Sequence, residues 1–273
     1  MTTASSVPVA LTIAGSDSSG GAGIQADLKT FAAFGVYGAS VVTALTAQST
    51  RGVQAVAEVD PGFVAQQLDA VLEDLPVRAA KTGMLARAAV IEIVVDRLTA
   101  RRPAHLVVDP VMVATSGAVL LEPAAVACLR ERLLPLATLV TPNLHEAAAL
   151  TGVAVRGPDE MREAARRLVA LGARAVLVKG GHLPGPALDV LYDGHDYREL
   201  SAPRLGTGPL HGAGCTLSAA ITAALSRGQD LGDAVATAKR YVTRAIETAT
   251  AIGHGATPLN HNLPPDGPER QPR

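Results

Sequence analysis

One short segment, residues 208–219, combines small residues with an ionisable side chain. Gly212, Ala213 and Gly214 come directly before an apolar helical run, and Cys215 stands at its start. The first N–H groups of a helix have no partners within it, and the helix dipole adds partial positive charge there. Small residues allow an anion to approach those donors closely. We interpret the segment as an anion pocket, suited to charge that develops on a transferred phosphoryl group, with a thiol at its edge.

Two structural alternatives stay open for this segment. Gly-x-Gly is also common in ordinary loops that lead into a helix and bind nothing. A lone cysteine is often a small buried hydrophobe rather than a nucleophile or a base. The rest of the chain must therefore decide between them.

The composition argues against nucleic-acid and membrane partners. The chain has 273 residues, 48% of them apolar, which is enough for one large core. A formal net charge of -1 and the absence of Trp argue against a nucleic-acid partner. We find no apolar run of membrane-span length and no secretory signal, so we expect no membrane partner. Cys128 and Cys215 make no disulfide framework and suit a reducing cytoplasm.

Short apolar runs that are typical of strands alternate with helical patterns. The predicted strands cover residues 9–14, 39–45, 53–59, 77–81, 105–108, 138–141 and 174–179, and the predicted helices cover 22–34, 61–75, 88–100, 123–134 and 159–171. Pro158 or Asp159 is expected to cap the last of these helices. A hairpin over 188–201 and helices near 214–228 and 230–252 follow. This alternation predicts an α/β fold, with a mostly parallel sheet covered on both faces.

Polar or Gly-rich residues follow strand after strand. They are Gly15-Ser-Asp17, Gln48, Thr82-Gly83, Asp109, Asn143 and Gly180-Gly181. In open parallel sheets, ligands bind outside the carboxyl ends of the strands. We therefore expect these positions to converge on one crevice that forms a shared site.

Several collinear motifs resemble one known family. They are Ala14-Gly-Ser-Asp-Ser-Ser-Gly-Gly-Ala-Gly-Ile-Gln-Ala-Asp27, Thr43-Ala-Leu-Thr-Ala-Gln48, Lys81-Thr-Gly-Met-Leu85, Val108-Asp-Pro-Val-Met112, Thr141-Pro-Asn-Leu-His-Glu-Ala147, Val178-Lys-Gly-Gly-His182 and His211-Gly-Ala-Gly-Cys-Thr-Leu-Ser-Ala219. The sequence resembles the hydroxymethylpyrimidine/phosphomethylpyrimidine kinases of the ribokinase-like superfamily. The resemblance covers about residues 9 to 255, and several motifs in order are more specific than one Gly-rich loop.

The resemblance implies a three-layer α/β/α sandwich and a defined reaction. That reaction is ATP-dependent phosphorylation of 4-amino-5-hydroxymethyl-2-methylpyrimidine, followed by phosphorylation of its monophosphate to the diphosphate used for thiamine. It also implies Mg2+ and a homodimer. We expect one kinase domain over residues 1–255 and a flexible, Pro-rich tail over 256–273.

The resemblance also implies a set of substrate-binding residues. They are Gly15, Asp27, Gln48, Gly83, Met84 and Val111. The amide of Gln48 can donate and accept, which suits an aminopyrimidine edge, and Asp27 can accept from an amino group or a ring N–H. The structural alternatives are a solvated charge for Asp27 and a core position for Met84.

Cys215 matches the family's proposed general base, at the end of the Gly212-Ala213-Gly214 turn. The usual superfamily residue at this position is Asp. A thiolate at a helix N-terminus is stabilised by the dipole, so we expect the pKa of Cys215 to fall. The thiolate would then attract the hydroxyl proton as the alcohol oxygen attacks the γ-phosphorus.

Five further matches lie on the nucleotide side of the predicted site. Asp109 and Glu146 match metal-side residues, although Glu146 would also be favoured as a helix-start carboxylate. Lys179, Asn143 and His211 match residues near the nucleotide phosphates, and Lys179 would act on them as a point charge. His182 is expected only to cap a loop.

Departures from the family pattern leave other functions open. Pro209 and Leu210 replace polar residues that are common before His211, and Ala213 and Ser49 stand where Thr and Asn are common. The alternatives are a pyridoxal kinase of the same fold and a non-catalytic sensor that kept the pyrimidine pocket. A dinucleotide-binding oxidoreductase is disfavoured, because Gly20-Gly-Ala-Gly23 does not fit Gly-x-Gly-x-x-Gly.

Overall fold

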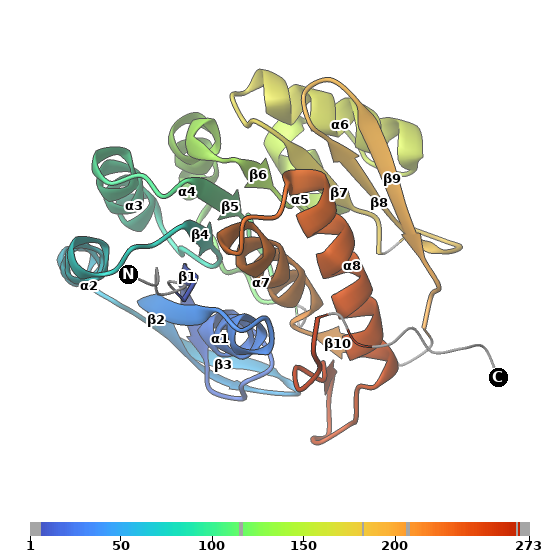
Figure 1. The fold of residues 1–273 in the computed structure, drawn as a ribbon, viewed down its shortest axis with the longest axis horizontal. Coiled ribbons are helices and arrows are strands. Elements are labelled where there is room, and N and C mark those ends of the chain that lie inside the picture. The colour runs from blue at the N-terminus through green and yellow to red at the C-terminus, as the bar shows by residue number, and fades with distance from the viewer. Residues whose placement is uncertain (1–6, 115–116, 182, 206–207, 266, 268–273) are drawn as a thin grey trace, which may run out of the picture.

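A computed structural model describes residues 7–114, 117–181, 183–205, 208–265 and 267, and Figure 1 shows their arrangement. The strands of the main sheet are β1 (Val9–Asp17), β2 (Tyr37–Ser49), β3 (Gly52–Glu58), β4 (Ala79–Thr82), β5 (His105–Val108), β6 (Leu139–Val140), β7 (Val176–Lys179), β8 (Ala187–Tyr192) and β9 (Tyr197–Ala202). Their order in the sheet is β3-β2-β1-β4-β5-β6-β7-β8-β9. Strands β2, β1, β4, β5, β6 and β7 pair in parallel, whereas β3, β8 and β9 pair antiparallel at the two edges. The predicted mostly parallel sheet is confirmed.

Helices cover both faces of this sheet. They are α1 (Gly23–Ala33), α2 (Pro61–Asp74), α3 (Ala88–Ala100), α4 (Pro123–Cys128), α5 (Leu144–Thr151), α6 (Pro158–Ala170), α7 (Ala213–Ser226) and α8 (Leu231–Glu247). Helices α2 to α6 lie on one face, and α1, α7 and α8 lie on the other (Figure 1). The expected α/β/α sandwich is therefore confirmed.

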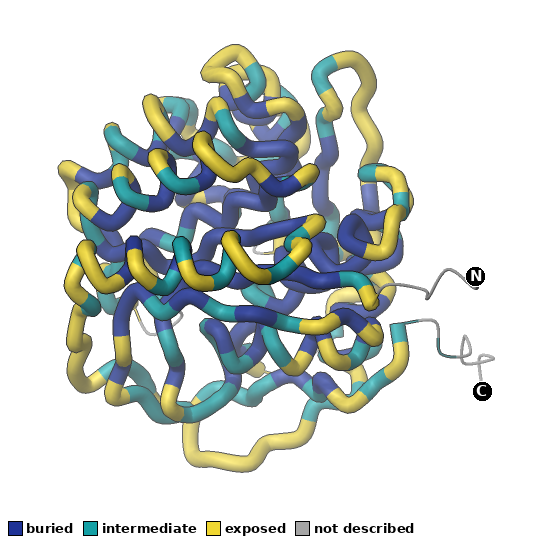
Figure 2. The backbone as a smooth tube through the Cα atoms, turned by 60° about the vertical axis from the view of Figure 1, so that its left-hand side comes forward, coloured by how far each residue is buried: buried dark blue, intermediate teal, exposed yellow. Residues whose placement is uncertain are grey.

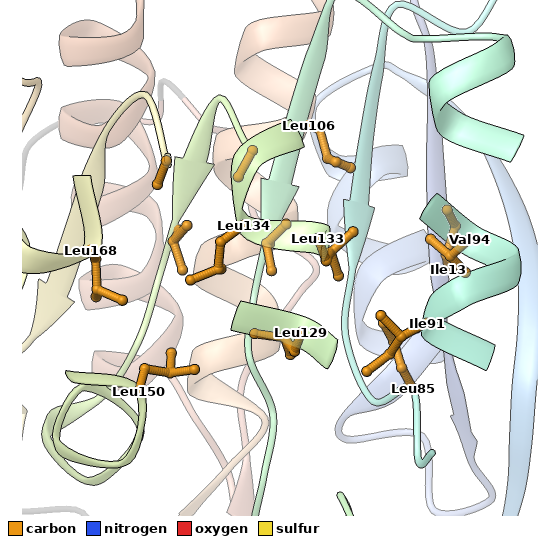
Figure 3. Close-up of a cluster of buried hydrophobic side chains, with 14 of the residues drawn as sticks. Ile13, Leu85, Ile91, Val94, Leu106, Leu129, Leu133, Leu134, Leu150 and Leu168 are labelled. Atoms are coloured by element: carbon orange, nitrogen blue, oxygen red, sulfur yellow. The ribbon is translucent and has the colours of Figure 1, made fainter. Parts of the chain in front are cut away.

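Two large apolar clusters bind the layers together, because parallel strands bury both of their faces. Leu11 and Ile13 of β1 belong to the cluster under α2 to α6, while Ala10, directly before Leu11, belongs to the cluster under α7 and α8. Figure 3 shows part of the first cluster, including Leu133 and Leu168. The strands form the buried centre of the tube in Figure 2, with exposed residues along the outer helices.

The region after α3 differs from the prediction in three helices. The helix expected over 123–134 is α-helical to Cys128, becomes a π-helix over Leu129–Leu133, and ends in a 3-10 turn over Leu134–Leu136. Pro135 has no N–H to continue an α-helix, which explains the end. Helix α5 was not predicted. The expected capping by Pro158 or Asp159 is wrong, because Gly157 is the N-cap of α6, without a side-chain hydrogen bond, and Pro158 is its first residue.

The start of the expected flexible tail is packed against the rest of the chain. Strand β11 (Thr257–Pro258) pairs in parallel with β10 (Leu210–His211), and Leu259 and His261 are buried. The Tyr241 hydroxyl donates to the backbone carbonyl of His261 at 3.1 Å. We name residues 257–261 the C-terminal strap. The boundary at residue 255 between one domain and a tail stays a prediction, but the strap is not a frayed end.

Acidification is expected to destabilise the protein through His261. Burial lowers the pKa of His261 from 6.5 to about 4. Below pH 6.5 the unfolded chain therefore binds a proton that the native state does not bind, so stability falls as the pH falls toward 4. Between pH 6.5 and 5 the expected loss is about 2 kcal/mol, at ~1.4 kcal/mol per pH unit. Urea unfolding of the wild type and His261→Gln at neutral and acid pH measures it, and an equal loss in both proteins would contradict this origin.

Candidate active site

The residues that follow the strands do converge at the carboxyl edge of the sheet. Gln48 and Asp17, from the ends of β2 and β1, both approach His211 of β10. At the other end of the site, Asp109 after β5 pairs with Lys179 of β7. A backbone bridge joins Asn143, after β6, to Lys179. The structure thus brings these polar positions together at one edge of the sheet, and the crevice between them stays a prediction.

The turn before α7 has the geometry of an anion site. Gly212 is the N-cap of α7 with φ 84°, in the left-handed region that favours glycine. A Cβ at Gly212 would also overlap the carbonyl oxygen of Gly21 in the β1–α1 loop. The first hydrogen bond within α7 runs from the Thr216 N–H to the Gly212 carbonyl at 2.9 Å. The N–H groups of residues 213–215 come before it and have no partner within the helix, and we call them the unpaired donors of α7. We name residues 212–215 the anion turn.

A buried ion pair lies beside the anion turn. Lys179 Nζ donates to Asp109 Oδ1 at 2.9 Å, and a Cβ added at Gly214 would stand 3.2 Å from that same Nζ. Ser218 of α7 donates to Asp109 Oδ2 at 3.1 Å. Burial acts to raise the pKa of Asp109, but the ammonium groups of Lys179 and Lys81 outweigh it and hold that pKa below its ordinary value. A positive charge is thus fixed next to the turn.

Asn143 and Glu146 cap the start of α5. The Asn143 side chain accepts from the Glu146 N–H at 2.9 Å, and the Glu146 carboxylate accepts from the Asn143 N–H at 2.7 Å. This reciprocal pair is a capping box, which is the structural alternative for Glu146. Burial raises the pKa of Glu146 to about 7, although the neighbouring Lys179 acts in the opposite direction. Nucleotide binding by Asn143 and metal binding by Glu146 stay predictions.

The acidic residues fit a magnesium ion that is held mostly through water. Among the described residues, no group of three or more His, Cys, Asp and Glu side chains could hold a metal. Asp109 and Glu146 are instead two buried carboxylates whose charges both raise the pKa of Lys179. Mg2+ commonly keeps several waters and takes its other ligands from one or two carboxylates and substrate phosphates. Such a donor set suits an ion that arrives with the nucleotide.

Asp27 lies in a buried ion pair rather than on the wall of a pocket. Its side chain has 0% exposure, both of its oxygens are 2.9 Å from Lys81 Nζ, and Thr12 donates to Oδ2 at 2.6 Å. Burial acts to lower the pKa of Lys81, but Asp27 outweighs it and raises that pKa, so the lysine is charged. The structure does not bring Asp27 to open space, and its predicted contact with the pyrimidine stays a prediction.

The Cys215 thiol is expected to be neutral in the ligand-free protein. Burial raises its pKa to about 11, against the lowering effect of the Lys81 ammonium; Asp27 and Asp109 raise it further. The expected fall of this pKa at a helix N-terminus is therefore wrong. Loss of solvent and two nearby carboxylates outweigh the donors at the start of the helix. The structure nevertheless places the thiol beside Lys81, on the anion turn.

Asp17 and His211 join the first loop of the chain to the anion turn. His211 Nε2 lies 2.7 Å from Asp17 Oδ2, and the same carboxylate accepts from the N–H groups of Ser19, Gly21 and Ala22. Burial acts to raise the pKa of Asp17, but the bond to His211 and these donors lower it to about 2. Asp17 is therefore ionised and accepts the His211 N–H. His211 was predicted near the nucleotide, yet its contacts lie on the side of Gln48.

The remaining predicted substrate residues line an apolar corner. Met84 packs with Ala44 and Ala86 in a third, small cluster, and Val111 lies against it. A Cβ at Gly15 would stand 3.1 Å from the Met84 sulfur. A side chain at Gly83 would be equally crowded, because a Cβ there would stand 3.0 Å from the Cβ of Ala14. Gln48 lies near the Gly15 end of this corner, because its side-chain oxygen is 3.0 Å from the Thr46 hydroxyl, which lies 2.9 Å from the Ser16 carbonyl oxygen. The residues predicted for one substrate are thus close together, apart from buried Asp27.

Three side chains of the site were given no role in the sequence, namely Lys81, Ser218 and Thr216, and Asp17 was expected there only as part of the Gly15-Ser-Asp17 strand end. Lys81 and Asp17 stand inside the motifs quoted above and at the ends of apolar strands, and this position could have indicated that they belong to the site. A charged residue in such a place needs a partner when it is buried. His182 lies outside the described residues.

Comparison with known proteins identifies the family. A family model described as phosphomethylpyrimidine kinase matches residues 17–260. The chain belongs to this family. It is 56% identical over 257 residues to the hydroxymethylpyrimidine/phosphomethylpyrimidine kinase of Rhizobium meliloti, covering 93% of this chain and 96% of the relative. It is 54% identical over 254 residues to the thiamine biosynthesis bifunctional protein ThiED of Geobacter sulfurreducens, covering 93% of this chain but only 52% of that longer relative.

A solved structure supports the fold and the use of a nucleotide. The ADP complex of Bacillus subtilis pyridoxal kinase matches with a TM-score of 0.88 and 40% identity, covering 94% of this chain and 98% of that one. The predicted family is therefore confirmed. As a member of the phosphomethylpyrimidine kinase family, the protein is a phosphotransferase. None of the helices in the described ranges combines the length and apolar character needed to cross a membrane. Magnesium, a homodimer and a cytoplasmic location stay predictions.

Two departures from the family pattern take part in backbone pairing. The Pro209 carbonyl accepts from the Thr257 N–H at 2.9 Å, and Leu210 lies opposite Thr257 in the β10–β11 pair. Proline lacks an N–H, but this contact uses only its carbonyl. The segment before the anion turn is therefore held by the C-terminal strap.

Proposed function

We propose that this chain phosphorylates 4-amino-5-hydroxymethyl-2-methylpyrimidine with ATP and then phosphorylates the resulting monophosphate. One observation carries the proposal. The unpaired N–H groups of residues 213–215 lie beside the Lys179–Asp109 pair, and the same turn bears the Cys215 thiol. A helix start with a fixed cation on one side and a thiol on the other suits transfer of a phosphoryl group to an alcohol.

The nucleotide phosphates are proposed to bind at the anion turn. Its N–H groups would donate to the γ-phosphate, and Lys179 would act as a point charge beside it. Asp109 and Glu146 would hold magnesium through water, and the ion would neutralise charge on the phosphates. Lys179 is already aligned by Asp109, so this charge needs little rearrangement when ATP binds.

The pyrimidine is proposed to lie in the apolar corner, against Met84 and Val111. The Gln48 amide at its border can exchange hydrogen bonds with an aminopyrimidine edge. A side chain at Gly15 would crowd the Met84 sulfur, so glycine at this position keeps the corner free of a further side chain. Asp27 would act at a distance, by fixing the charge of Lys81 beside Cys215.

In the first transfer, the hydroxymethyl oxygen attacks the γ-phosphorus. The bond from phosphorus to the oxygen bridging the β- and γ-phosphates breaks, and ADP leaves with that electron pair. The hydroxyl proton passes to the sulfur of Cys215, which must first have lost its own proton to solvent. In the second transfer the acceptor is a phosphate oxygen that is already ionised, so the step depends on positioning and charge neutralisation.

The rate of the first transfer is expected to rise with pH. Because the pKa of Cys215 is raised to about 11, only the small thiolate fraction can accept the hydroxyl proton near neutrality. That fraction grows about tenfold per pH unit below the pKa, and the first-step rate should follow it. Single-turnover rates over the pH range in which the protein is folded test this. If the rate of the first step is independent of pH, as we expect for the second step, Cys215 is excluded as the base.

A pyridoxal kinase is the second candidate, favoured by the similarity to the Bacillus subtilis enzyme. Mass spectrometry of reactions with ATP and each acceptor separates the two. We expect the diphosphate from the pyrimidine monophosphate. Phosphorylation of pyridoxal without that product would overturn the proposal in favour of the second candidate. Tight pyrimidine binding without turnover of any acceptor would overturn both in favour of a sensor.

A further inference from the structure

The C-terminal strap lies against the anion turn, although more than forty residues separate them in the chain. Figure 1 shows the red C-terminal chain running past β10, and β11 of the strap pairs with β10 there. Pro258 lies opposite His211, the residue directly before the turn. Further along the strap, His261 approaches the first turn of α7. The strap therefore contacts the phosphate-binding element on both sides of Gly212.

His261 forms the end of a buried chain of hydrogen bonds. Its Nε2 is 3.0 Å from the hydroxyl oxygen of Thr216, and that hydroxyl is 2.9 Å from the Gly212 carbonyl oxygen. Thr216 has 0% exposure and His261 only 7%. The Gly212 carbonyl also accepts the N–H of Thr216 at 2.9 Å. The hydrogen bonds that lead from the His261 imidazole through the Thr216 hydroxyl to the Gly212 carbonyl are thus all made between protein groups.

The direction of these bonds follows from the number of protons. Burial lowers the pKa of His261 to about 4, so its ring is neutral near pH 7 and carries one N–H. The Thr216 hydroxyl has one proton, and the Gly212 carbonyl can only accept. Both contacts are satisfied when His261 donates through Nε2 and Thr216 donates to Gly212. The imidazole thus acts on the turn through one hydroxyl.

The peptide between Gly212 and Ala213 connects this chain to the anion site. A peptide unit is planar, so its C=O and its N–H point in opposite directions. When two hydrogen bonds hold the Gly212 carbonyl toward the helix, the Ala213 N–H is held toward the outside of the turn. This N–H is the first of the unpaired donors of α7. An orientation set by His261 therefore reaches a donor of the anion site.

The strap does not need the imidazole in order to stay in place. Leu259 is buried, and the Asn260 N–H donates to the Ala245 carbonyl at 3.1 Å. The Tyr241 hydroxyl bonds the backbone of His261, not its ring. The ring contact with Thr216 is thus additional to the anchoring of the strap.

We propose that His261 is a positioning residue for phosphoryl transfer, which acts through Thr216 on the Gly212–Ala213 peptide. The proposal rests on the proposed function of the anion turn. It gives one side chain of the C-terminal strap, that of His261, a role in supporting the anion turn. It also assigns a role to a residue in the segment that sequence reasoning treats as a tail.

Substitutions that separate the hydrogen bond from the packing test this role. His261→Leu keeps a side chain in the space of the imidazole but removes the N–H that donates to Thr216. His261→Gln retains an N–H near the position of Nε2. We expect His261→Leu to lower kcat for both transfers by about 10- to 100-fold, since misplaced groups cost rates of this order. We expect KM for the pyrimidine to stay unchanged and Gln to restore most of kcat. Asn260→Ala, which removes the side-chain bond to Thr248 from the same strap, is the matched control and should keep kcat.

Thr216→Val breaks the same chain of hydrogen bonds at its middle and leaves the packing of His261 unchanged, so it tests the role even if His261→Leu does not fold. It should lower kcat to a similar extent, and the double variant should lose little more, because both changes break one chain. A wild-type kcat in His261→Leu or in Thr216→Val would overturn the proposal. An equal loss in His261→Leu and His261→Gln, with both proteins folded, would overturn it as well.

Nucleotide binding without an acceptor distinguishes this proposal from the proposed function. Calorimetry with Mg2+ and the ATP analogue AMP-PCP needs no pyrimidine. We expect weaker binding to His261→Leu than to the wild type and His261→Gln. If no pyrimidine is phosphorylated but this difference is found, the function fails and the positioning role stands. If pyrimidines are phosphorylated and all the variants equal the wild type, the positioning role alone fails.

Discussion

Replacement of Cys215 by alanine is expected to slow the first phosphorylation far more than the second. The first acceptor is an alcohol that must lose a proton, whereas the second is a phosphate that has already lost its own. General-base catalysis contributes about 10²- to 10⁴-fold, so we expect a loss of at least ~100-fold in the first single-turnover rate. The second rate should fall less than ~10-fold, because the backbone donors of the anion turn are retained.

The matched control for this prediction is the other cysteine of the chain. Cys128, at the end of α4, is half-buried on the opposite face of the sheet, and its thiol faces the Ala88 carbonyl. Cys128→Ala should leave both rates near the wild-type values. Rapid-quench measurement of the monophosphate and the diphosphate gives the two rates separately. Equal losses at both steps in Cys215→Ala would exclude a role in proton transfer.

Lys81→Met is expected to destabilise the fold more than any surface change. Both members of the Lys81–Asp27 pair have 0% exposure, so the substitution leaves a carboxylate buried without its cation. Breaking such a pair on one side costs about 3–5 kcal/mol. Urea unfolding should show a midpoint well below that of the wild type. The double variant Lys81→Met/Asp27→Leu should recover much of the loss, since it removes the uncompensated charge as well.

An exposed ion pair provides the comparison for Lys81. Arg97 and Asp69 are 2.8 Å apart with side chains 35% and 40% exposed. Arg97→Met should cost less than about 1 kcal/mol, because water screens this pair and already solvates its members. If Lys81→Met were as mild as Arg97→Met, the pair would not be the electrostatic support of the site that the structure indicates.

The sequence predicted the layers well because their signals are local. The strand over 105–108 and the helix over 88–100 have the predicted bounds, since short apolar runs and helical spacing are read within a few residues. Helix α5 has only eight residues, and the sequence indicated it only through Glu146 as a helix-start carboxylate. The C-terminal strap is held by contacts with β10 and α8 that no local pattern records.

The site was predicted as a set of positions but not as a network of contacts. Strand ends predicted Gln48, Asp109 and Asn143, because topology alone brings strand ends together, whereas Lys179 was predicted from the family resemblance. The partner of Asp27 lies 54 residues away along the chain, so its burial could not be read from its own helix. The same distant charges, together with burial, explain why the pKa of Cys215 rises where its helix position suggested a fall.

One structure tests the central claim most directly: a complex with Mg2+, AMP-PCP and the hydroxymethyl pyrimidine. We expect the γ-phosphate at hydrogen-bond distance from the N–H groups of residues 213–215. The hydroxymethyl oxygen should lie between the phosphorus and the sulfur of Cys215. A complex with the phosphates away from this turn, or with that sulfur facing away from the alcohol, would contradict the account.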